Sequence, residues 1–417
     1  MPGIIPLKEP FDLDHRLQPV VPEIRKFRTR KALLASGLWK AHGLELERVA
    51  DGIEYWLNPE PVRRPSRPFV RVAAWNIERG KRLEAVFGGL GHELLQSADV
   101  LILNEADIGM ARSGQRNIAR LAAERMGMHY VFGNHYLCLD RGNPRDTLML
   151  GKDGTVIGAR GNLPDEENSL GLHGNAILTH FPVLCAENLP LHETKDKFRS
   201  SEKRFGVKKA LWADIGTPHG PLTVGAVHLD SMASPARRAR QLDDLLSRLN
   251  GVRAGKPVIV GGDWNTSTYD LQSPLHLAWN LLKKFLRGGF AHAVPSYMTP
   301  YEIYDREIFE TAVRNGFAWR EFNNLAQSTS LYDVDDPEAA NIVRDQVGLI
   351  GVKLLRWRLA PWNGKAPLKV DWFSGRNLSP AGPEPASGAL APLVLERFRP
   401  GGRKASDHDP VIADIRW

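Results

Sequence analysis

Residues 258–265, Val-Ile-Val-Gly-Gly-Asp-Trp-Asn, combine a short apolar run with two polar side chains at its end. The β-branched run predicts a buried strand, and the two glycines let the backbone turn sharply after it. Asp263 and Asn265 are two residues apart, so their side chains point the same way if the chain stays extended. An aspartate accepts a proton or binds a metal, and an asparagine donates two hydrogen bonds to a phosphoryl oxygen. Taken alone, the stretch is more typical of a polar turn whose side chains cap their own backbone.

Polar residues that could hold a metal or a phosphate recur beside other apolar strands of the chain. They are Asn76, Glu105, His228, Asp263 with Asn265, Asp371, and Asp407 with His408. Strand ends on one edge of a sheet sandwich converge on a shared mouth, so these side chains are expected to gather there. Carboxylates and Asn without a cysteine cluster suit an oxygen-preferring cation, Mg²⁺ or Mn²⁺. The histidines could be metal ligands, but a base or a phosphate-binding cation fits better beside so many oxygens.

Strands and helices must position these residues, and the apolar pattern predicts where they lie. The expected strands are Phe69–Trp75, Asp99–Glu105, Tyr130–Phe132, Ala176–Leu178, Lys209–Ile215, Leu222–His228 and Leu368–Phe373. The expected helices are Leu83–Leu95, Asn117–Met126 and Arg237–Leu249. The segment 140–170 is rich in Gly, Asp, Asn and Pro, which predicts a loop.

Composition and charge limit the class of protein. A chain of 417 residues with 42% hydrophobic and 25% charged residues is typical of a globular protein with a sizeable core. Its net charge of +7 favours an anionic partner such as nucleic acid, phospholipid headgroups or a phosphorylated small molecule, although it serves solubility equally well. Two cysteines, Cys138 and Cys185, cannot make a disulfide framework. No secretory signal and no run long enough to span a bilayer is seen, so we expect a cytoplasmic protein without stable membrane insertion.

Several short motifs, taken in order, resemble the endonuclease/exonuclease/phosphatase superfamily of DNase I-like metal-dependent phosphoesterases. They are Trp75-Asn76-Ile77, Asn104-Glu105, Gly174 to Leu178, Val227-His228-Leu229, Gly262 to Asn265, Val370 to Ser374 and Ser406 to Pro410. The resemblance implies a four-layer αββα sandwich, in which two mostly antiparallel sheets pack together with helices on both outer faces. Two departures stand out: Asn104 replaces a common Gln, and Trp-Phe-Ser follows Asp371 where Tyr-x-x-x-Ser is more usual. Neither removes a ligand.

The resemblance also implies roles for the metal-binding residues. Glu105 is the expected main metal ligand, with Asn76 and Asp407 close by. Glu78 is a weaker candidate, expected instead to be a surface carboxylate in a loop.

The remaining residues have implied catalytic roles. Asp263 should orient or deprotonate the attacking water, or assist the leaving group, and Asn265 and His228 should hold phosphoryl oxygens. Asp371 should hydrogen-bond His408, fixing its tautomer and raising its pKa, at a separation of roughly 2.6–3.2 Å.

The chain divides into an N-terminal extension, residues 1–66, and a catalytic domain, residues 67–417, with an insertion at about 270–365. The extension has a segment of helical composition from Ile24 to His42. Its cations could touch an anionic polymer, although such a run is more often a solvated helix face: Arg25, Lys26, Arg28, Arg30 and Lys31.

The insertion is expected to shape substrate access, because both of its ends adjoin the site. It contains helical stretches at Leu275–Leu286 and Ile308–Asn315. The first could lie on a membrane, although a buried core face is the commoner cause of such a pattern.

Three functions remain open from the sequence. The first is a divalent-metal-dependent hydrolase of phosphate esters, a phosphodiesterase or nuclease acting by in-line attack of water. The second is a lipid or phosphoinositide phosphoesterase similar to the sphingomyelinases, suggested by the segment Leu275–Arg287. The third is a catalytically inactive binding protein of the same fold, which the intact set of polar residues argues against.

Overall fold

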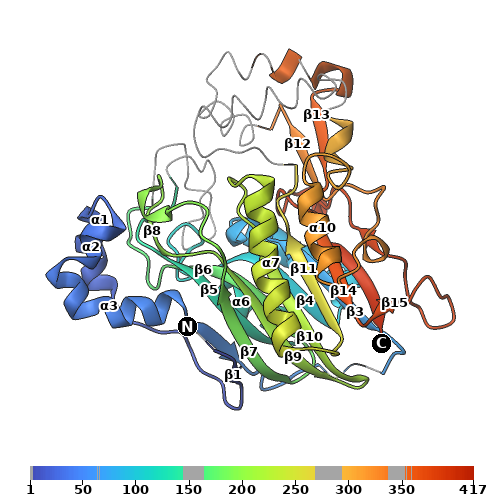
Figure 1. The fold of residues 1–417 in the computed structure, drawn as a ribbon, viewed down its shortest axis with the longest axis horizontal. Coiled ribbons are helices and arrows are strands. Elements are labelled where there is room, and N and C mark those ends of the chain that lie inside the picture. The colour runs from blue at the N-terminus through green and yellow to red at the C-terminus, as the bar shows by residue number, and fades with distance from the viewer. Residues whose placement is uncertain are drawn as a thin grey trace.

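The structure of the chain, a computed structural model, describes residues 3–143, 164–267, 294–336 and 353–417, apart from Arg63, Pro65, Leu354 and Arg358. Two large β-sheets form the centre of the molecule, and helices lie on both outer faces (Figure 1). The four-layer αββα sandwich predicted from the sequence is therefore confirmed.

The larger sheet has nine strands within the described residues. Seven follow the order β15-β17-β3-β4-β6-β5-β2, while β16 pairs with β17 and β8 with β5. Only β3 and β4 run parallel among its described pairs. The bounds are β2 Ile53–Trp56, β3 Val70–Asn76, β4 Val100–Ile108, β5 His129–Cys138, β6 Leu172–Thr179, β8 Arg204–Gly206, β15 Ser379–Pro380, β16 Leu393–Val394 and β17 Val411–Arg416.

The second sheet has six strands within the described residues, in the order β1-β7-β9-β10-β11-β14. Its one parallel pair there is β10 with β11. The bounds are β1 Ile5–Pro6, β7 Val183–Pro190, β9 Lys209–Thr217, β10 Gly220–His228, β11 Val258–Asp263 and β14 Asp371–Arg376. Both sheets are thus mostly antiparallel, as predicted.

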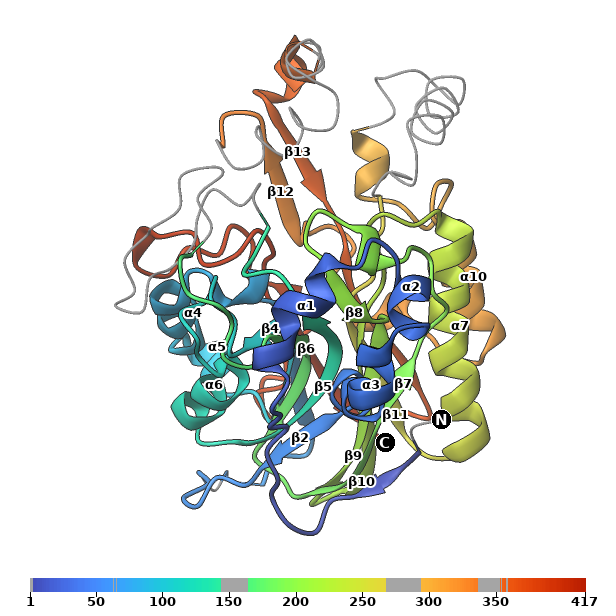
Figure 2. The same ribbon diagram turned by 90° about the vertical axis from the view of Figure 1, so that its left-hand side faces the viewer.

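Helices cover the outer face of each sheet. Figure 2 shows α4, α5 and α6 on one side of the strands and α7 and α10 on the other. The bounds are α1 Val21–Lys26, α2 Arg30–Leu34, α3 Gly37–Ala50, α4 Leu83–Leu90, α5 Glu93–Gln96, α6 Ile118–Met126, α7 Pro235–Val252 and α10 Arg306–Arg314. The single helix predicted over Leu83–Leu95 is therefore interrupted after Leu90.

Alternating side chains of each strand serve different layers of the core. In β3, Val72 and Ala74 point between the two sheets, whereas Ala73 and Trp75 point to the layer of α3 to α6. In β11, Ile259 faces the space between the sheets, while its neighbours pack against α7 and α10. This period of two is what a strand buried on both faces requires.

The first 66 residues contribute to both sheets. β1 pairs with β7 at the edge of the six-stranded sheet, and β2 pairs with β5 at the edge of the larger sheet. The predicted helical segment from Ile24 to His42 is divided among α1, α2 and α3. The division of the chain at residue 66 stays a prediction.

A two-stranded ribbon leads from the six-stranded sheet. It pairs β12, Ser330–Asp333, with β13, Lys365–Leu368 (Figure 1). The single strand predicted over Leu368–Phe373 is wrong, because the chain leaves the ribbon at Leu368 and joins the sheet only at Asp371. Between them, Val370 bonds outside both ladders: its N–H donates to Thr329 Oγ1 and its carbonyl accepts from Trp264 N–H.

The stretch Leu275–Leu286, considered above as a membrane-surface helix, lies outside the described residues. Among the helices that the structure describes, none has both the length and the apolar composition needed to cross a bilayer.

Candidate active site

The ends of four strands bring the predicted site residues to one edge of the sandwich. β3 and β4 run parallel, and Asn76 at the end of β3 pairs in register with Asn104. β10 and β11 also run parallel, and their last residues, His228 and Asp263, are partners. Asp371 begins the antiparallel strand β14 directly opposite Asp263. Parallel strands end on the same edge of a sheet, and this edge is where the two sheets present their polar residues together.

Asp263 is the centre of this arrangement. It is buried, and its carboxylate accepts hydrogen bonds from Asn76 Nδ2 at 3.1 Å, from the backbone N–H of Asn265 at 2.8 Å and from Asn265 Nδ2 at 2.9 Å. Its own backbone N–H donates to Asn104 Oδ1 at 2.9 Å. Asn76 and Asn104 belong to the other sheet, so these bonds fix the position of one sheet edge relative to the other.

Asn265 does not continue the extended strand. Its φ of 50° is in the left-handed region, and its amide curls back onto Asp263. A second bond joins Asn265 Nδ2 to the Leu229 carbonyl at 2.9 Å. Both Nδ2 protons of Asn265 are therefore engaged. To donate to a phosphoryl oxygen, Asn265 must break its bond to Asp263 or its bond to the Leu229 carbonyl.

Asp371 and His408 form a direct pair. His408 Nδ1 lies 2.9 Å from Asp371 Oδ2, within the separation that the sequence predicts. Ser406 holds the segment in place, because its hydroxyl donates to the Asn76 carbonyl at 2.6 Å and accepts from His408 N–H at 3.1 Å. The other ring nitrogen, Nε2, lies 3.9 Å from Asp263.

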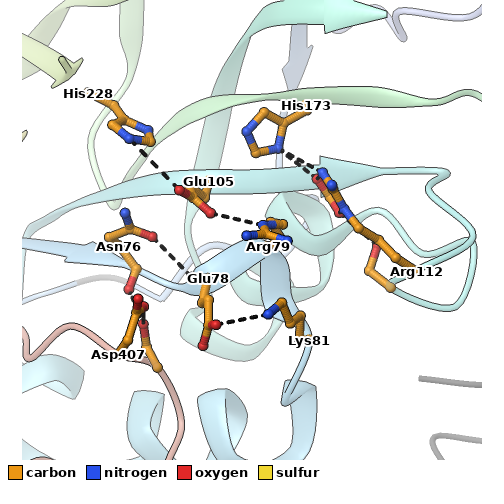
Figure 3. A network of polar contacts seen from close by, with 12 residues as sticks. Asn76, Glu78, Arg79, Lys81, Glu105, Arg112, His173, His228 and Asp407 are labelled. Atoms are coloured by element: carbon orange, nitrogen blue, oxygen red, sulfur yellow. Dashed lines mark hydrogen bonds and ion pairs between the residues drawn. The ribbon is translucent and has the colours of Figure 1, made fainter. Parts of the chain in front are cut away.

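Glu105 lies between a histidine and an arginine. Figure 3 shows His228 on one side of its carboxylate and Arg79 on the other. His228 Nε2 is 3.8 Å from Glu105 Oε1, and Arg79 Nε donates to Glu105 Oε2 at 3.2 Å. Glu105 has a φ of 57°, and the ladder between β4 and β6 is irregular from Leu103 to Ala106. This local bulge aims the carboxylate away from the strand, a type of backbone strain that is common at functional sites.

Beyond Glu105, β4 is anchored by a buried charge network. Arg112 donates to Asp107 through Nε at 2.7 Å and through Nη2 at 2.9 Å, and to Glu202 through Nη1 at 2.6 Å. His173 Nδ1 lies 2.8 Å from Asp107. Figure 3 shows His173 beside Arg112 in this network. Each charge in the network has a partner, which is the condition for burying ions without a large cost.

Glu78 is buried, so the expectation of a surface carboxylate is wrong. It forms ion pairs with Lys81 at 2.9 Å and with Arg82. Burial would raise its pKa, but the charges of Lys81, Arg82 and Arg79 outweigh it and lower the pKa to about 2. These cations come one and three to four residues later in a turn, where sequence spacing alone does not indicate burial.

The charges of the two histidines differ. Burial and the nearby Lys208 hold the pKa of His228 well below its usual value. Burial acts in the same sense on His408, but the charges of Asp371, Asp263 and Asp407 outweigh it and raise the pKa of His408 well above its usual value. His228 is therefore neutral and His408 is a cation at neutral pH.

The pKa values of two carboxyl groups of the site are raised by burial and by neighbouring carboxylates. Burial and the charge of Asp371 raise the pKa of Asp263 to about 7. Asp407 lies exposed at the mouth, yet desolvation by its surroundings together with the charges of Glu78 and Glu105 raises its pKa. One carboxylate oxygen, Asp371 Oδ1, is buried with no hydrogen-bond partner among the described residues.

These features fit a divalent cation. The donors are oxygens of carboxylates and an amide, without cysteine, as Mg²⁺ or Mn²⁺ prefers. Within the described residues one group of three has ligand atoms within 4.8 Å of one another: Asp263, Asp371 and His408. Of the predicted ligands, Asn76 already uses its Oδ1 to accept from Glu78 N–H at 3.0 Å. The assignment of Asn76, Glu105 and Asp407 as metal ligands stays a prediction.

Three residues of the site escape sequence reasoning. Arg79 pairs with Glu105, Lys208 places its ammonium 3.4 Å from the Leu229 carbonyl, and Thr329 Oγ1 accepts from the backbone N–H of Asp371 at 3.0 Å. Lys208 and Thr329 lie outside the quoted motifs, and only the fold brings them to the site. Arg79 comes two residues after the motif Trp75-Asn76-Ile77, and this proximity is the one signal that could have found it.

Comparison with known proteins gives one family. Residues 73–322 match the profile described as "Endonuclease/Exonuclease/phosphatase family". No curated protein matches the chain.

Solved structures align with most of the chain at low identity. An endonuclease/exonuclease/phosphatase from Beutenbergia cavernae is 17% identical, with 84% of this chain and 72% of that chain covered and a TM-score of 0.46. The human Nocturnin catalytic domain with bound sulfate is 16% identical, with 85% and 96% covered and a TM-score of 0.41. D. rerio TDP2 with single-strand DNA product is 13% identical, with 84% and 99% covered and a TM-score of 0.45. Likeness at this level carries no argument about what the chain binds.

Proposed function

Because the chain belongs to the endonuclease/exonuclease/phosphatase family, we propose that it is a divalent-metal-dependent phosphodiesterase that cleaves nucleic acid or a related diester by in-line attack of water. The observation that carries the proposal is the convergence of Asn76, Glu105, His228 and Asp263 with the Asp371–His408 pair at one edge of the sandwich. The proposal also includes a cytoplasmic location, which the free cysteines Cys138 and Cys185 favour.

The metal, Mg²⁺ or Mn²⁺, is held in this proposal by Glu105 with Asn76 and Asp407. Bound there, it supplies charge that stabilises the phosphoryl oxygens during displacement. The carboxylates of Glu78 and Glu105 near Asp407 support this role, because a bound cation would relieve their repulsion of Asp407.

Protein side chains perform the proton and charge transfers. Asp263, with a pKa of about 7, accepts the proton of the attacking water and is held for this by Asn76 and Asn265. His408 is already a cation and stabilises the negative charge that develops on the phosphoryl group. Neutral His228 offers one ring N–H to a phosphoryl oxygen, and Asn265 offers an amide N–H.

The proposal is tested with bis(p-nitrophenyl) phosphate, plasmid, single-stranded DNA and RNA. Dialysis against EDTA should abolish turnover, and Mg²⁺ or Mn²⁺ should restore it. Glu105→Gln should cut the rate by about 10²-fold or more and raise the metal concentration that gives half-maximal rate. Glu310→Gln, which changes an exposed carboxylate of α10, is the matched control and should behave as the wild type. Full turnover in EDTA would refute the metal-dependent mechanism.

A further inference from the structure

Two basic segments that are far apart in the sequence lie against each other. Residues 25–31 connect α1 to α2, and residues 193–204 lead through the short 3₁₀ helix Lys197–Arg199 to β8 (Figure 2). Lys203 Nζ donates to the backbone carbonyls of Arg25 at 2.5 Å and Phe27 at 2.7 Å. Arg30 lies 3.6 Å from Glu193. Together we call residues 25–31 and 193–204 the basic surface.

The basic surface has more positive charge than it pairs internally. Its sequence holds ten Lys and Arg against three Asp and Glu. Several cations are engaged in ion pairs, namely Arg25 with Glu167, Lys26 with Glu23, Arg30 with Glu193, Lys197 with Asp230 and Arg204 with Glu202.

Of the five cations outside these ion pairs, Lys203 donates to backbone carbonyls, which leaves four. Within the part of the chain that the structure describes, Arg28, Lys31, Lys195 and Arg199 make no ion pair, and all but Lys195 are exposed. Like charges repel one another, so an anionic partner bound over these cations would stabilise the arrangement.

The basic surface reaches the candidate active site. Lys197 pairs with Asp230 at 3.3 Å, Thr194 also donates to Asp230, and Asp230 follows His228 by two residues. Lys208, just after β8, donates to the Leu229 carbonyl, which also accepts from Asn265. A polymeric substrate with one phosphate at the site is therefore long enough to continue from there over the basic surface, whereas a small phosphate ester is not.

Lipid is a poorer fit than a polymer. The large apolar side chains of the two segments are Phe27, which is half-buried, and Phe198, which is buried. Charge without an apolar anchor gives weak membrane binding but is sufficient for a phosphate backbone.

We propose that the basic surface binds the phosphodiester backbone of a nucleic acid strand whose scissile bond lies at the candidate active site. The proposal rests on the proposed function, because it takes the strand to be the substrate. It assigns substrate binding to the N-terminal segment and to residues 193–204.

Binding is measured by fluorescence anisotropy of labelled single-stranded and duplex oligonucleotides, in EDTA and over a series of salt concentrations. Two double variants test the two segments separately: Arg28→Glu with Lys31→Glu, and Lys195→Glu with Arg199→Glu. Each double variant should weaken binding by about tenfold or more at low salt. The slope of log affinity against log salt is negative, and on a single strand it should become less steep by about 0.7 for each lost phosphate contact. Hydrolysis of bis(p-nitrophenyl) phosphate should be unchanged, since that diester is too small to extend from the site to the four unpaired cations.

The matched control is Lys256→Glu with Arg416→Glu, two exposed cations at the opposite ends of the strands. This control makes the same change in net charge. It should leave binding within about twofold of the wild type, because its charges lie more than a Debye length from the bound strand and are screened by salt. Thermal unfolding of every variant at the wild-type temperature checks that the fold is kept.

The outcomes separate the two proposals. The proposal for the basic surface is overturned by any of three results. These are wild-type affinity in both double variants, an equal loss of affinity in the control, and binding to anionic phospholipid vesicles without binding to oligonucleotides. A selective loss of oligonucleotide binding supports strand binding by the basic surface. If the wild-type protein also hydrolyses no diester, the proposed function and the placement of a scissile bond are refuted, and strand binding is not.

Discussion

The two histidines of the candidate site have the same chemistry and different surroundings. His228 ends β10 in the six-stranded sheet, and its Nε2 lies 3.5 Å from Asp263 and 3.8 Å from Glu105. Its Nδ1 has no hydrogen-bond partner among the described residues. His408 precedes β17 in the larger sheet, and its Nδ1 lies 2.9 Å from Asp371.

The difference shows what sets the charge of a buried histidine. Desolvation lowers the pKa of both rings, and carboxylates lie near both. Only His408 has a carboxylate at hydrogen-bond distance, with further carboxylates beyond it, whereas His228 also lies near the Lys208 ammonium. A nearby carboxylate is therefore insufficient by itself; a direct hydrogen bond and the absence of a competing cation decide the protonation state.

The largest effect is expected from breaking the Asp371–His408 pair. His408→Ala and Asp371→Ala should each lower kcat/KM by about 10²-fold or more, because both remove the cation that stabilises phosphoryl charge. The double variant should cost little beyond the worse single variant, because the two residues act as a unit. Kinetics with bis(p-nitrophenyl) phosphate at saturating Mg²⁺ measure the three rates.

His228→Gln provides the comparison for that experiment. A glutamine keeps an N–H donor without charge, so it should replace a neutral His228 at a loss of about tenfold or less. Strictly additive losses at Asp371 and His408, or an equal loss in His228→Gln and His408→Gln, would contradict the assignment of opposite charges.

The stability of the metal-free protein should depend on pH in opposite senses through the two histidines. His408 has a raised folded-state pKa, so its contribution is fully present below pH 6.5, the unfolded value, and is lost as pH rises through the folded pKa. His228 has a lowered folded-state pKa, so stability is lost as pH falls from 6.5 through the folded pKa, because the unfolded state then binds more protons. Each slope should reach about 1.4 kcal/mol per pH unit inside its window.

Urea unfolding in EDTA across pH 4–9 measures both slopes. His408→Asn should flatten the dependence above pH 6.5, and His228→Asn should flatten it below. The two charge states are wrongly assigned if His408→Asn flattens the profile below pH 6.5 and His228→Asn flattens it above, or if neither variant changes the profile.

Much of the fold follows from the pattern of apolar residues. The runs at Val258–Val260 and Leu222–His228 are buried strands, because β-branched and apolar residues can be buried on both faces of a central strand. The strand predicted over Leu368–Phe373 is wrong, because the pattern does not encode that Thr329 takes the N–H groups of Val370 and Asp371 out of the ladder. β7 and β12 carry little apolar alternation, so their pairing depends on neighbouring strands.

For the candidate site, sequence reasoning names the residues at strand ends but not the contacts between them. Asp263 and Asn265 do gather, yet by a left-handed turn at Asn265 and not by an extended strand. Glu78 is buried because Lys81 and Arg82 fold back onto it, which spacing alone does not specify. Such contacts depend on tertiary packing, and a single sequence contains no direct signal of it.

The smallest effect is expected at Thr329, which acts on His408 but not on His228. Thr329 is fully buried, its hydroxyl accepts from Asp371 N–H, and its backbone carbonyl accepts from Asp409 N–H at 2.7 Å. It therefore joins the two segments that carry Asp371 and His408. Thr329→Val keeps the shape but leaves the N–H groups of Val370 and Asp371 unpaired, which should lower the free energy of unfolding by about 1–3 kcal/mol.

The same change should lower kcat by less than about tenfold, since Asp371 remains in place but is held less firmly. Thr329→Ser restores the acceptor and should recover most of the stability and rate, as measured by urea unfolding and diester hydrolysis. The pH dependence of stability below pH 6.5, which is assigned to His228, should be identical in all three proteins. No described hydrogen bond of Thr329 reaches the surroundings of His228. If Thr329→Val changed the pH dependence of stability below pH 6.5, the two histidines would be coupled, and their surroundings could not be treated as separate.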